Sequence, residues 1–286
     1  MMQETFTEYF CREGRSELDV ILFDIDGTLA CGGRPLPGAG DLLSFLNKEK
    51  YPYLLLTNDC CSSHQQKAAI LQRAGLPVEA EHIFSCGDVL KLWKRQSCYN
   101  GELYFLCGTL GTPCYAELAG IRVTADPDRI MTCAGVIFGE GRYDWQNHLE
   151  AVFNFFLEHP HAPFLVINPD SYWPSLYHPG MGLGSGAQAR FILSVLKEAG
   201  KDTEILYLGK PYPPVYEALK AELAERFQRE IAPCRIAMVG DSLASDIRGA
   251  KANGLFACLV LSGITTPELA ESAPADRIPD LIFSGI

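Results

Sequence analysis

The chain has 286 residues, of which 48% are hydrophobic, enough for one large domain or two ordinary ones with buried cores. Its formal net charge is -11 and no Lys/Arg-rich run occurs, so the composition argues against a nucleic-acid or anionic-membrane surface. No apolar run approaches the roughly 20 residues of a membrane span, and the start lacks a basic segment leading into an apolar one, so we expect a cytoplasmic protein.

The first predicted strand covers residues 20–23 and runs straight into Asp24 and Asp26. Four consecutive apolar residues are typical of a strand buried on both faces, as in a parallel sheet covered by helices. Ligands bind at the carboxyl ends of such strands, so two carboxylates arrive at the expected position of an active site. The alternative is an ordinary turn, because Asp and Gly are common after strands.

A second strand ends at Thr57 and Asn58, and helices are predicted over 63–74 and 88–95. Far more chain follows than a crossover between two strands needs. It has an α/β pattern of its own: strand 102–107, helix 112–119 with Thr112 as its cap, strand 133–138, helix 144–159 and strand 164–168.

Residues 168–186 are rich in Pro and Gly and are predicted to form a connection that leads into a helix over 187–199. The first sheet is then expected to resume: strand 205–208, helix 214–229, strand 235–239, helix 245–253 and strand 256–261. Two of these strands also end in charged residues, because Lys210 follows the first, and Asp241 and Asp246 follow the second. Four such endings in one chain are hard to assign to turn chemistry.

In this order the endings resemble the four motifs of the haloacid dehalogenase superfamily of phosphotransferases. The matching positions are Asp24 to Leu29, Thr57, Lys210, and Asp241 with Asp246. The Thr-Asn pair, the Gly-Lys-Pro around Lys210 and the Pro-Gly-Ala at 37–39 are similar to the NagD or p-nitrophenylphosphatase branch. One position departs from that branch, which commonly has a second Asn where this chain has Asp59, a change that bears on substrate choice.

The resemblance implies a Rossmann-like parallel-sheet core with an inserted α/β cap. The core would comprise residues 1–82 and 204–286, and the cap residues 83–203. It also implies a Mg²⁺-dependent phosphatase of small phosphorylated metabolites, such as a sugar phosphate, a nucleotide monophosphate, phosphoglycolate or pyridoxal phosphate. The sequence does not identify the physiological ester. It also leaves open whether the chain forms a homo-oligomer through the cap.

The resemblance implies a role for each matching residue. Asp24 would be the nucleophile that becomes an aspartyl phosphate, and Asp26 the acid and base. Thr57, Asn58 and Lys210 would hold the phosphate. The Mg²⁺ ligands would be Asp24, the backbone carbonyl of Asp26, Asp241 and Asp246.

Recognition of the leaving group is expected from the segment that begins Asn-Pro-Asp, which is similar to the substrate-facing cap loop of NagD-like enzymes. The candidate substrate-binding residues there are Asn168, Asp170, Tyr172, Trp173 and His178. The alternative is an ordinary connection whose aromatic rings pack on the cap.

Two other functions stay open. A phosphotransferase or phosphomutase on the same scaffold would pass the phosphoryl group to another alcohol, and a non-catalytic metabolite-binding regulator would do no chemistry. The intact acids and lysine argue against the regulator, and dehalogenation is disfavoured because it needs neither Asp26 nor a metal.

Eleven cysteines without a Cys-x-x-Cys pair are typical of reduced thiols, and histidines without an i, i+4 pair give no support to a zinc site.

Overall fold

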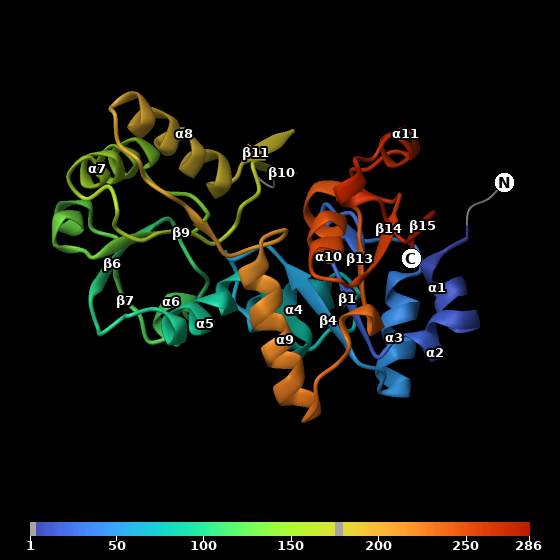
Figure 1. Ribbon diagram of the computed structural model, residues 1–286. Helices are drawn as coiled ribbons and strands as arrows, with labels where there is room; N and C mark the ends of the chain where they lie inside the picture. Colours follow the sequence, from blue (N-terminus) through green and yellow to red (C-terminus); the bar gives the residue numbers. More distant parts are fainter. Residues whose placement is uncertain (1–3, 175–179) are drawn as a thin grey trace. The chain divides into compact units, whose positions relative to one another are not determined.

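The computed structural model describes residues 4–174 and 180–286, which form two units. Unit 1 contains the chain up to residue 57, residues 64–84 and residues 210–286, and unit 2 contains residues 58–63 and 85–209. Each unit has its own sheet and its own helices (Figure 1). Within the described ranges, no helix is both long and apolar enough to cross a membrane.

Unit 1 is organised around a six-stranded sheet. In spatial order its strands are β15 (Leu281–Phe283), β14 (Phe256–Val260), β13 (Ile236–Gly240), β1 (Val20–Phe23), β4 (Tyr53–Thr57) and β5 (Ile83–Ser85). The pairs β1–β13, β1–β4, β13–β14 and β14–β15 are parallel. All four residues of β1 are buried, as expected for a central strand with both faces covered.

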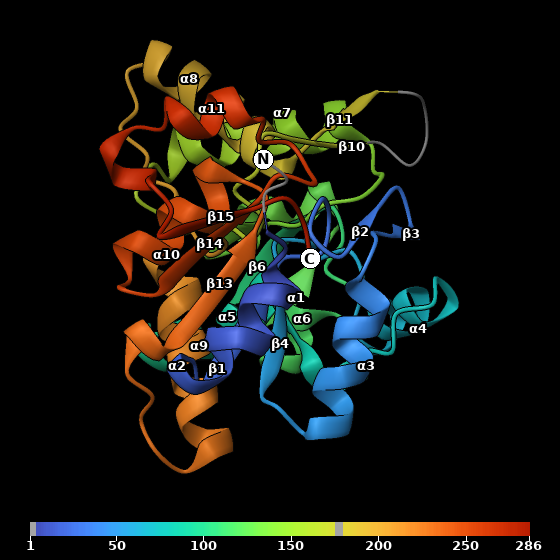
Figure 2. The same cartoon turned by 90° about the vertical axis from the view of Figure 1, so that its right-hand side faces the viewer.

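The helices of unit 1 pack on both sides of this sheet. They are α1 (Phe6–Tyr9), α2 (Arg15–Glu17), α3 (Ala39–Glu49), α4 (His64–Arg73), α9 (Pro213–Phe227), α10 (Arg248–Ala252) and α11 (Pro267–Glu271). Apolar residues of α1, α3 and α4 form one buried cluster with Ile21 and Phe23 of β1. Helices α9 and α10 lie on the opposite side of the sheet (Figure 2).

Unit 2 contains a second parallel sheet. Its strands, in spatial order, are β12 (Leu206–Tyr207), β9 (Phe164–Val166), β8 (Gly135–Phe138), β6 (Leu103–Cys107) and β7 (Arg122–Thr124). Its helices are α5 (Val89–Gln96), α6 (Tyr115–Leu118), α7 (Trp145–Glu158) and α8 (Ser185–Glu198). Helices α7 and α8 bury Phe155, Phe156 and Ile192 against β6, β8 and β9, which gives unit 2 its own core.

Shorter elements complete both units. Two antiparallel hairpins are β2 (Ala30–Cys31) with β3 (Arg34–Pro35), and β10 (Tyr172–Pro174) with β11 (Met181–Leu183). π-helical turns cover Phe10–Gly14 and Leu243–Ile247, and 3₁₀ turns cover Ala80–His82, Cys86–Asp88, Pro127–Thr132, Pro233–Arg235 and Ala275–Arg277.

The structure corrects three sequence-based predictions. The apolar run at 205–208 does not resume the first sheet, because β12 pairs with β9 in unit 2 and the chain returns to unit 1 at Lys210. Helix α6 begins at Tyr115 after a turn, so Thr112 is not its cap. The stretch predicted as a helix over 245–253 begins as a π-helical turn at Leu243 before α10.

Candidate active site

The carboxyl ends of β1 and β13 lie side by side in unit 1. The two strands are parallel neighbours in register, with Phe23 opposite Val239. The backbone N–H of Asp24 donates to the carbonyl oxygen of Val239 at 2.9 Å, which extends the pairing past the end of β1. Asp241 directly follows β13, so the sheet itself brings the first and fourth motifs together.

Lys210 lies at the centre of the group and is only 2% exposed. Its ammonium Nζ is 2.6 Å from Oδ1 of Asp24 and 2.7 Å from Oδ1 of Asp246. Burial disfavours the charged form of this lysine, but the two carboxylates outweigh that effect and raise its pKa. Lys210 is therefore a fixed positive charge bound to two acids that are far away in the sequence.

Asp24, Asp241 and Asp246 form a group of three carboxylates whose ligand oxygens lie within 4.8 Å of one another. Burial, followed by the charges of Asp24 and Asp246, raises the pKa of Asp241 to about 8. Burial, partly offset by Lys210, raises the pKa of Asp246 to about 6. Two buried acids and the half-buried Asp24 beside one ammonium leave an excess of negative charge in this part of the protein.

That charge excess fits a hard divalent cation. Mg²⁺ binds oxygen ligands through one or two carboxylates, and these three side chains offer only oxygen. Lys210 balances part of their charge, and the remainder is what a bound cation would neutralise. The residues present therefore fit the metal that the sequence resemblance implies.

A loop after β14 holds Asp241 and was not predicted. The N–H of Ile264 donates to Oδ2 of Asp241 at 2.7 Å. The Thr265 hydroxyl donates to the backbone carbonyl oxygen of Asp241 at 2.5 Å. Ser262 and Gly263 lie at the start of this loop. The signal was present in the sequence, because this is a fifth apolar run that ends in small polar residues.

Gly27 and Gly263 enclose the Asp241 carboxylate. An ideal Cβ would lie 2.2 Å from Oδ2 of Asp241 at Gly27 and 1.8 Å from it at Gly263. Gly27 also has a φ of +84°, which side chains with a Cβ rarely adopt. The Asp-x-Asp-Gly motif therefore needs glycine for both its turn and the close approach of Asp241.

The substitution Gly27→Ala is expected to lower activity by about 10²-fold, because the added methyl group displaces Asp241 by an ångström or so. Gly33→Ala is the matched control. Gly33 also has a positive φ, +75°, but no atom lies within 4 Å of its Cβ position, so the control keeps the strain without the clash. Steady-state kinetics of both variants test this, and an equal loss in both would assign the effect to backbone strain.

Asp26 and Thr57 complete the motif residues of unit 1. Asp26 is exposed, and its backbone forms a bridge with Ala30 that closes the turn after β1. Thr57 is the last residue of β4, the other neighbour of β1, and its side chain is 4% exposed. Both residues therefore lie at the same sheet edge as Asp24.

The structure groups Asn58, Asn168 and Asp170 within unit 2. Nδ2 of Asn58 donates to Oδ2 of Asp170 at 3.1 Å, and the Asn168 side chain accepts the N–H of Asp170 at 2.8 Å. Asn58 and Asn168 are both 5% exposed. The amide of Asn58 thus fixes the Asn-Pro-Asp segment, a role that sequence reasoning did not assign to it.

The aromatic candidates occupy the hairpin of β10 and β11. Tyr172 is 59% exposed and pairs with Leu183, whereas the Trp173 ring lies over Gly182, where an added Cβ would be 2.9 Å from the ring. Trp173 therefore packs within the hairpin, while Tyr172 offers its ring to solvent. His178 lies outside the described residues.

Comparison with known proteins identifies the family. Residues 21–122 match a model of haloacid dehalogenase-like hydrolases, and residues 207–285 match a second model of hydrolases of this type. The chain belongs to the haloacid dehalogenase superfamily. The two matches contain all four sequence motifs, so the predicted family and the predicted hydrolase class are confirmed.

Relatives of this hydrolase extend over most of its length. Mouse chronophin is 25% identical over 88% of this chain and 84% of its own. The ribonucleotide monophosphatase NagD of Escherichia coli is 26% identical over 89% of this chain and 92% of its own. Among solved structures, a Mycobacterium tuberculosis glycerol phosphate phosphatase in complex with magnesium is 25% identical, with a TM-score of 0.76, over 95% of this chain and 76% of that one.

Proposed function

We propose that this hydrolase is a Mg²⁺-dependent phosphatase that cleaves small phosphate monoesters through a phosphorylated Asp24. One observation carries the proposal: the Lys210 ammonium binds both Asp24 and Asp246, and Asp241 lies within the same group. A carboxylate attacks a phosphate anion only where positive charge offsets the repulsion. The buried lysine supplies part of that charge at the proposed nucleophile.

The chain's own acids would hold the metal. Asp24, Asp241 and the backbone carbonyl of Asp26 would be ligands, with Asp246 bound directly or through water. When bound, Mg²⁺ supplies further positive charge next to the phosphate. The excess of carboxylates over cations around Lys210 supports this assignment.

The proposed reaction has two displacements at phosphorus. A carboxylate oxygen of Asp24 bonds to phosphorus while the bond to the ester oxygen breaks, and Asp26 gives that oxygen a proton. Asp26 then takes a proton from water, and the water oxygen bonds to phosphorus while the bond between phosphorus and the Asp24 oxygen breaks. This step releases inorganic phosphate and regenerates the Asp24 carboxylate. Thr57 and the N–H of Asn58 would hold phosphate oxygens during both steps. The exposed position of Asp26 favours proton exchange with the leaving group and water.

The proposed substrates are small phosphorylated metabolites, in line with the names of the relatives, which include a ribonucleotide monophosphatase and a dihydroxyacetone phosphatase. We place the reaction in the cytoplasm, because none of the eleven cysteines, all within the described residues, forms a disulfide, as is usual in a reducing compartment.

Removal of divalent metal is expected to abolish turnover, and Mg²⁺ to restore it. Calcium should not restore it, because its larger radius and irregular coordination misplace the nucleophile and the phosphate. The measurement is release of inorganic phosphate and of alcohol from a panel of phosphate monoesters. Equal amounts of both products support hydrolysis, and a phosphate deficit when a second alcohol is added would indicate phosphoryl transfer. Full activity in excess chelator would overturn the metal role.

We further propose that unit 2 recognises the part of the ester that leaves. The groups assigned to unit 1 serve the phosphate, the metal and the proton, so specificity needs other side chains. Tyr172 combines an exposed ring with a hydroxyl group, which suits contact with a sugar or a base. The Asn58–Asp170 hydrogen bond fixes the segment that leads to this hairpin.

The substitution Tyr172→Ala is expected to change the ranking of kcat/KM among natural esters, while p-nitrophenyl phosphate, an activated ester, is hydrolysed nearly as before. Leu183→Ala is the matched control, because Leu183 lies opposite Tyr172 in the hairpin and is also 59% exposed. Parallel losses for all substrates, or the same change of ranking in the control, would show that the hairpin acts through packing.

A further inference from the structure

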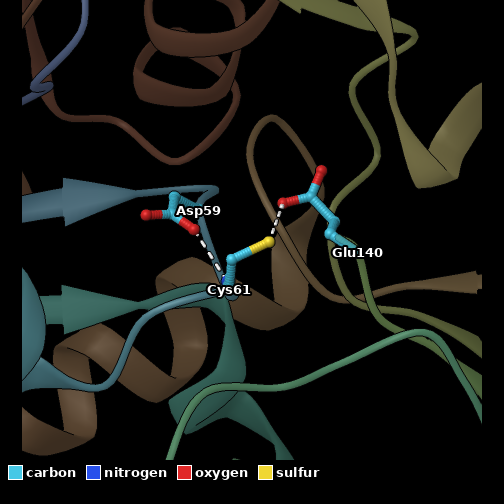
Figure 3. A group of neighbouring side chains, drawn as sticks. All are labelled: Asp59, Cys61 and Glu140. Carbon is cyan, nitrogen blue, oxygen red and sulfur yellow. Dashed lines mark hydrogen bonds between the residues drawn. The ribbon is translucent and has the colours of Figure 1, made fainter. Parts of the chain in front are cut away.

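A second group of side chains that could bind a metal ion lies entirely within unit 2 (Figure 3). Asp59 and Cys61 come from the loop after β4, and Glu140 follows β8. A carboxylate oxygen of Asp59, the Sγ of Cys61 and a carboxylate oxygen of Glu140 all lie within 4.8 Å of one another. The proposed phosphatase reaction uses none of these three side chains.

Glu140 is held so that one oxygen faces the thiols. Its backbone exchanges two hydrogen bonds with Thr109, at 2.7 and 3.0 Å, and its Oε1 accepts from Nδ2 of Asn168 at 2.7 Å. Its other oxygen, Oε2, lies 3.8 Å from Sγ of Cys61 and 3.9 Å from Sγ of Cys60. An amide that fixes one oxygen of a carboxylate orients the other for a ligand.

The loop that carries Asp59 and Cys61 is also fixed within unit 2. Oδ1 of Asp59 accepts the backbone N–H of Cys61 at 2.7 Å, which fixes the Asp59 side chain relative to the backbone of Cys61 (Figure 3). The Ser85 hydroxyl donates to the backbone carbonyl of Asp59 at 2.9 Å, and the Tyr115 hydroxyl donates to that of Ser62 at 3.0 Å. The loop therefore presents its ligand atoms from a hydrogen-bonded frame.

We propose that Asp59, Cys61 and Glu140 bind a divalent cation of the zinc class. One thiolate and two carboxylates suit Zn²⁺ or its analogue Co²⁺, whereas Mg²⁺ selects sites made of oxygen alone. Cys61 is exposed, so it can lose its thiol proton to solvent as the metal binds. Three protein ligands leave one tetrahedral position for water or a small ligand, and the ion ties the loop to Glu140.

Cobalt tests this site without any assay of turnover. The full chain, with Mg²⁺ in excess to occupy sites made of oxygen, is titrated with Co²⁺. A Cys61 thiolate on Co²⁺ gives a near-ultraviolet charge-transfer absorption, and we expect it to saturate with a single Co²⁺ per chain. Cys61→Ser should abolish this absorption. Cys98→Ser, which removes another exposed thiol of unit 2, should retain it.

Two further variants keep the thiol and test the carboxylates. Asp59→Asn and Glu140→Gln are each expected to weaken Co²⁺ binding by about tenfold or more, since each removes a charged ligand. No absorption in the parent protein, its persistence in Cys61→Ser, or parent-like affinity in both carboxylate variants would overturn the proposal. Because the measurement is of absorption, these results are independent of the proposed phosphatase activity.

Discussion

Replacement of Asp24 by asparagine is expected to reduce phosphate release by about 10⁴-fold or more, because the amide cannot attack phosphorus. The fold should persist. Asparagine keeps the shape of the side chain, and removing one of three clustered carboxylates relieves repulsion within the group around Lys210. Single-turnover kinetics, together with thermal unfolding in chelator, measure both effects.

Asp19→Asn is the matched control for this substitution. Asp19 lies just before β1, at the other end of the strand that delivers Asp24, and forms an ion pair with Arg235 at 2.8 Å. It has no part in the proposed chemistry, so activity should stay within about twofold of the parent, the range expected for a partly exposed ion pair. Activity in Asp24→Asn comparable to the control would exclude Asp24 as nucleophile.

Loss of the Lys210 charge is expected to have the second large effect. Lys210→Met keeps most of the side-chain volume but leaves Asp24 and Asp246 without the ammonium that both contact. Breaking a buried ion pair in this way costs about 3–5 kcal/mol of unfolding free energy. We also expect turnover to fall by about 10²–10³-fold, as when a preorganised electrostatic contact to a transition state is removed. Urea unfolding in chelator and steady-state kinetics measure the two effects.

The matched control for this lysine is Lys251→Met. Lys251 also forms an ion pair in unit 1, with Asp280 at 2.6 Å, but it is exposed. Exposed pairs contribute roughly 0–1 kcal/mol, so the control should unfold almost like the parent. Equal stability of the two variants would mean that the buried acids are neutral in the folded protein and do not need Lys210.

The sheet of unit 1 could be predicted because its central strands are continuous apolar runs that end in chemically distinctive residues. The predicted strands at 20–23 and 235–239 correspond to β1 and β13, and the parallel pairing of β1 and β13 places Asp24 next to Asp241. Lys210 could be assigned through the family resemblance alone. Its two ion pairs join residues 186 and 36 positions apart, which no local pattern reveals.

Other features could not be predicted, for physical reasons that the structure makes plain. The apolar run that contains β12 has the same pattern in either sheet, and only its pairing with β9 decides between them. The β10–β11 hairpin forms in a segment whose prolines and glycines indicate a loop. The group of Asp59, Cys61 and Glu140 joins two loops 79 residues apart, so it becomes visible only in three dimensions.

The most direct test of the central claim is to trap the phosphoryl group on the enzyme. Asp26→Asn should slow both proton transfers, by about 10²–10⁴-fold, and a rapid acid quench during reaction with a ³²P-labelled phosphate monoester should capture the intermediate. The account predicts hydroxylamine-sensitive label on the peptide that contains Asp24, and none in the Asp24→Asn variant. Phosphate release without enzyme-bound label, or label that persists in Asp24→Asn, would contradict it.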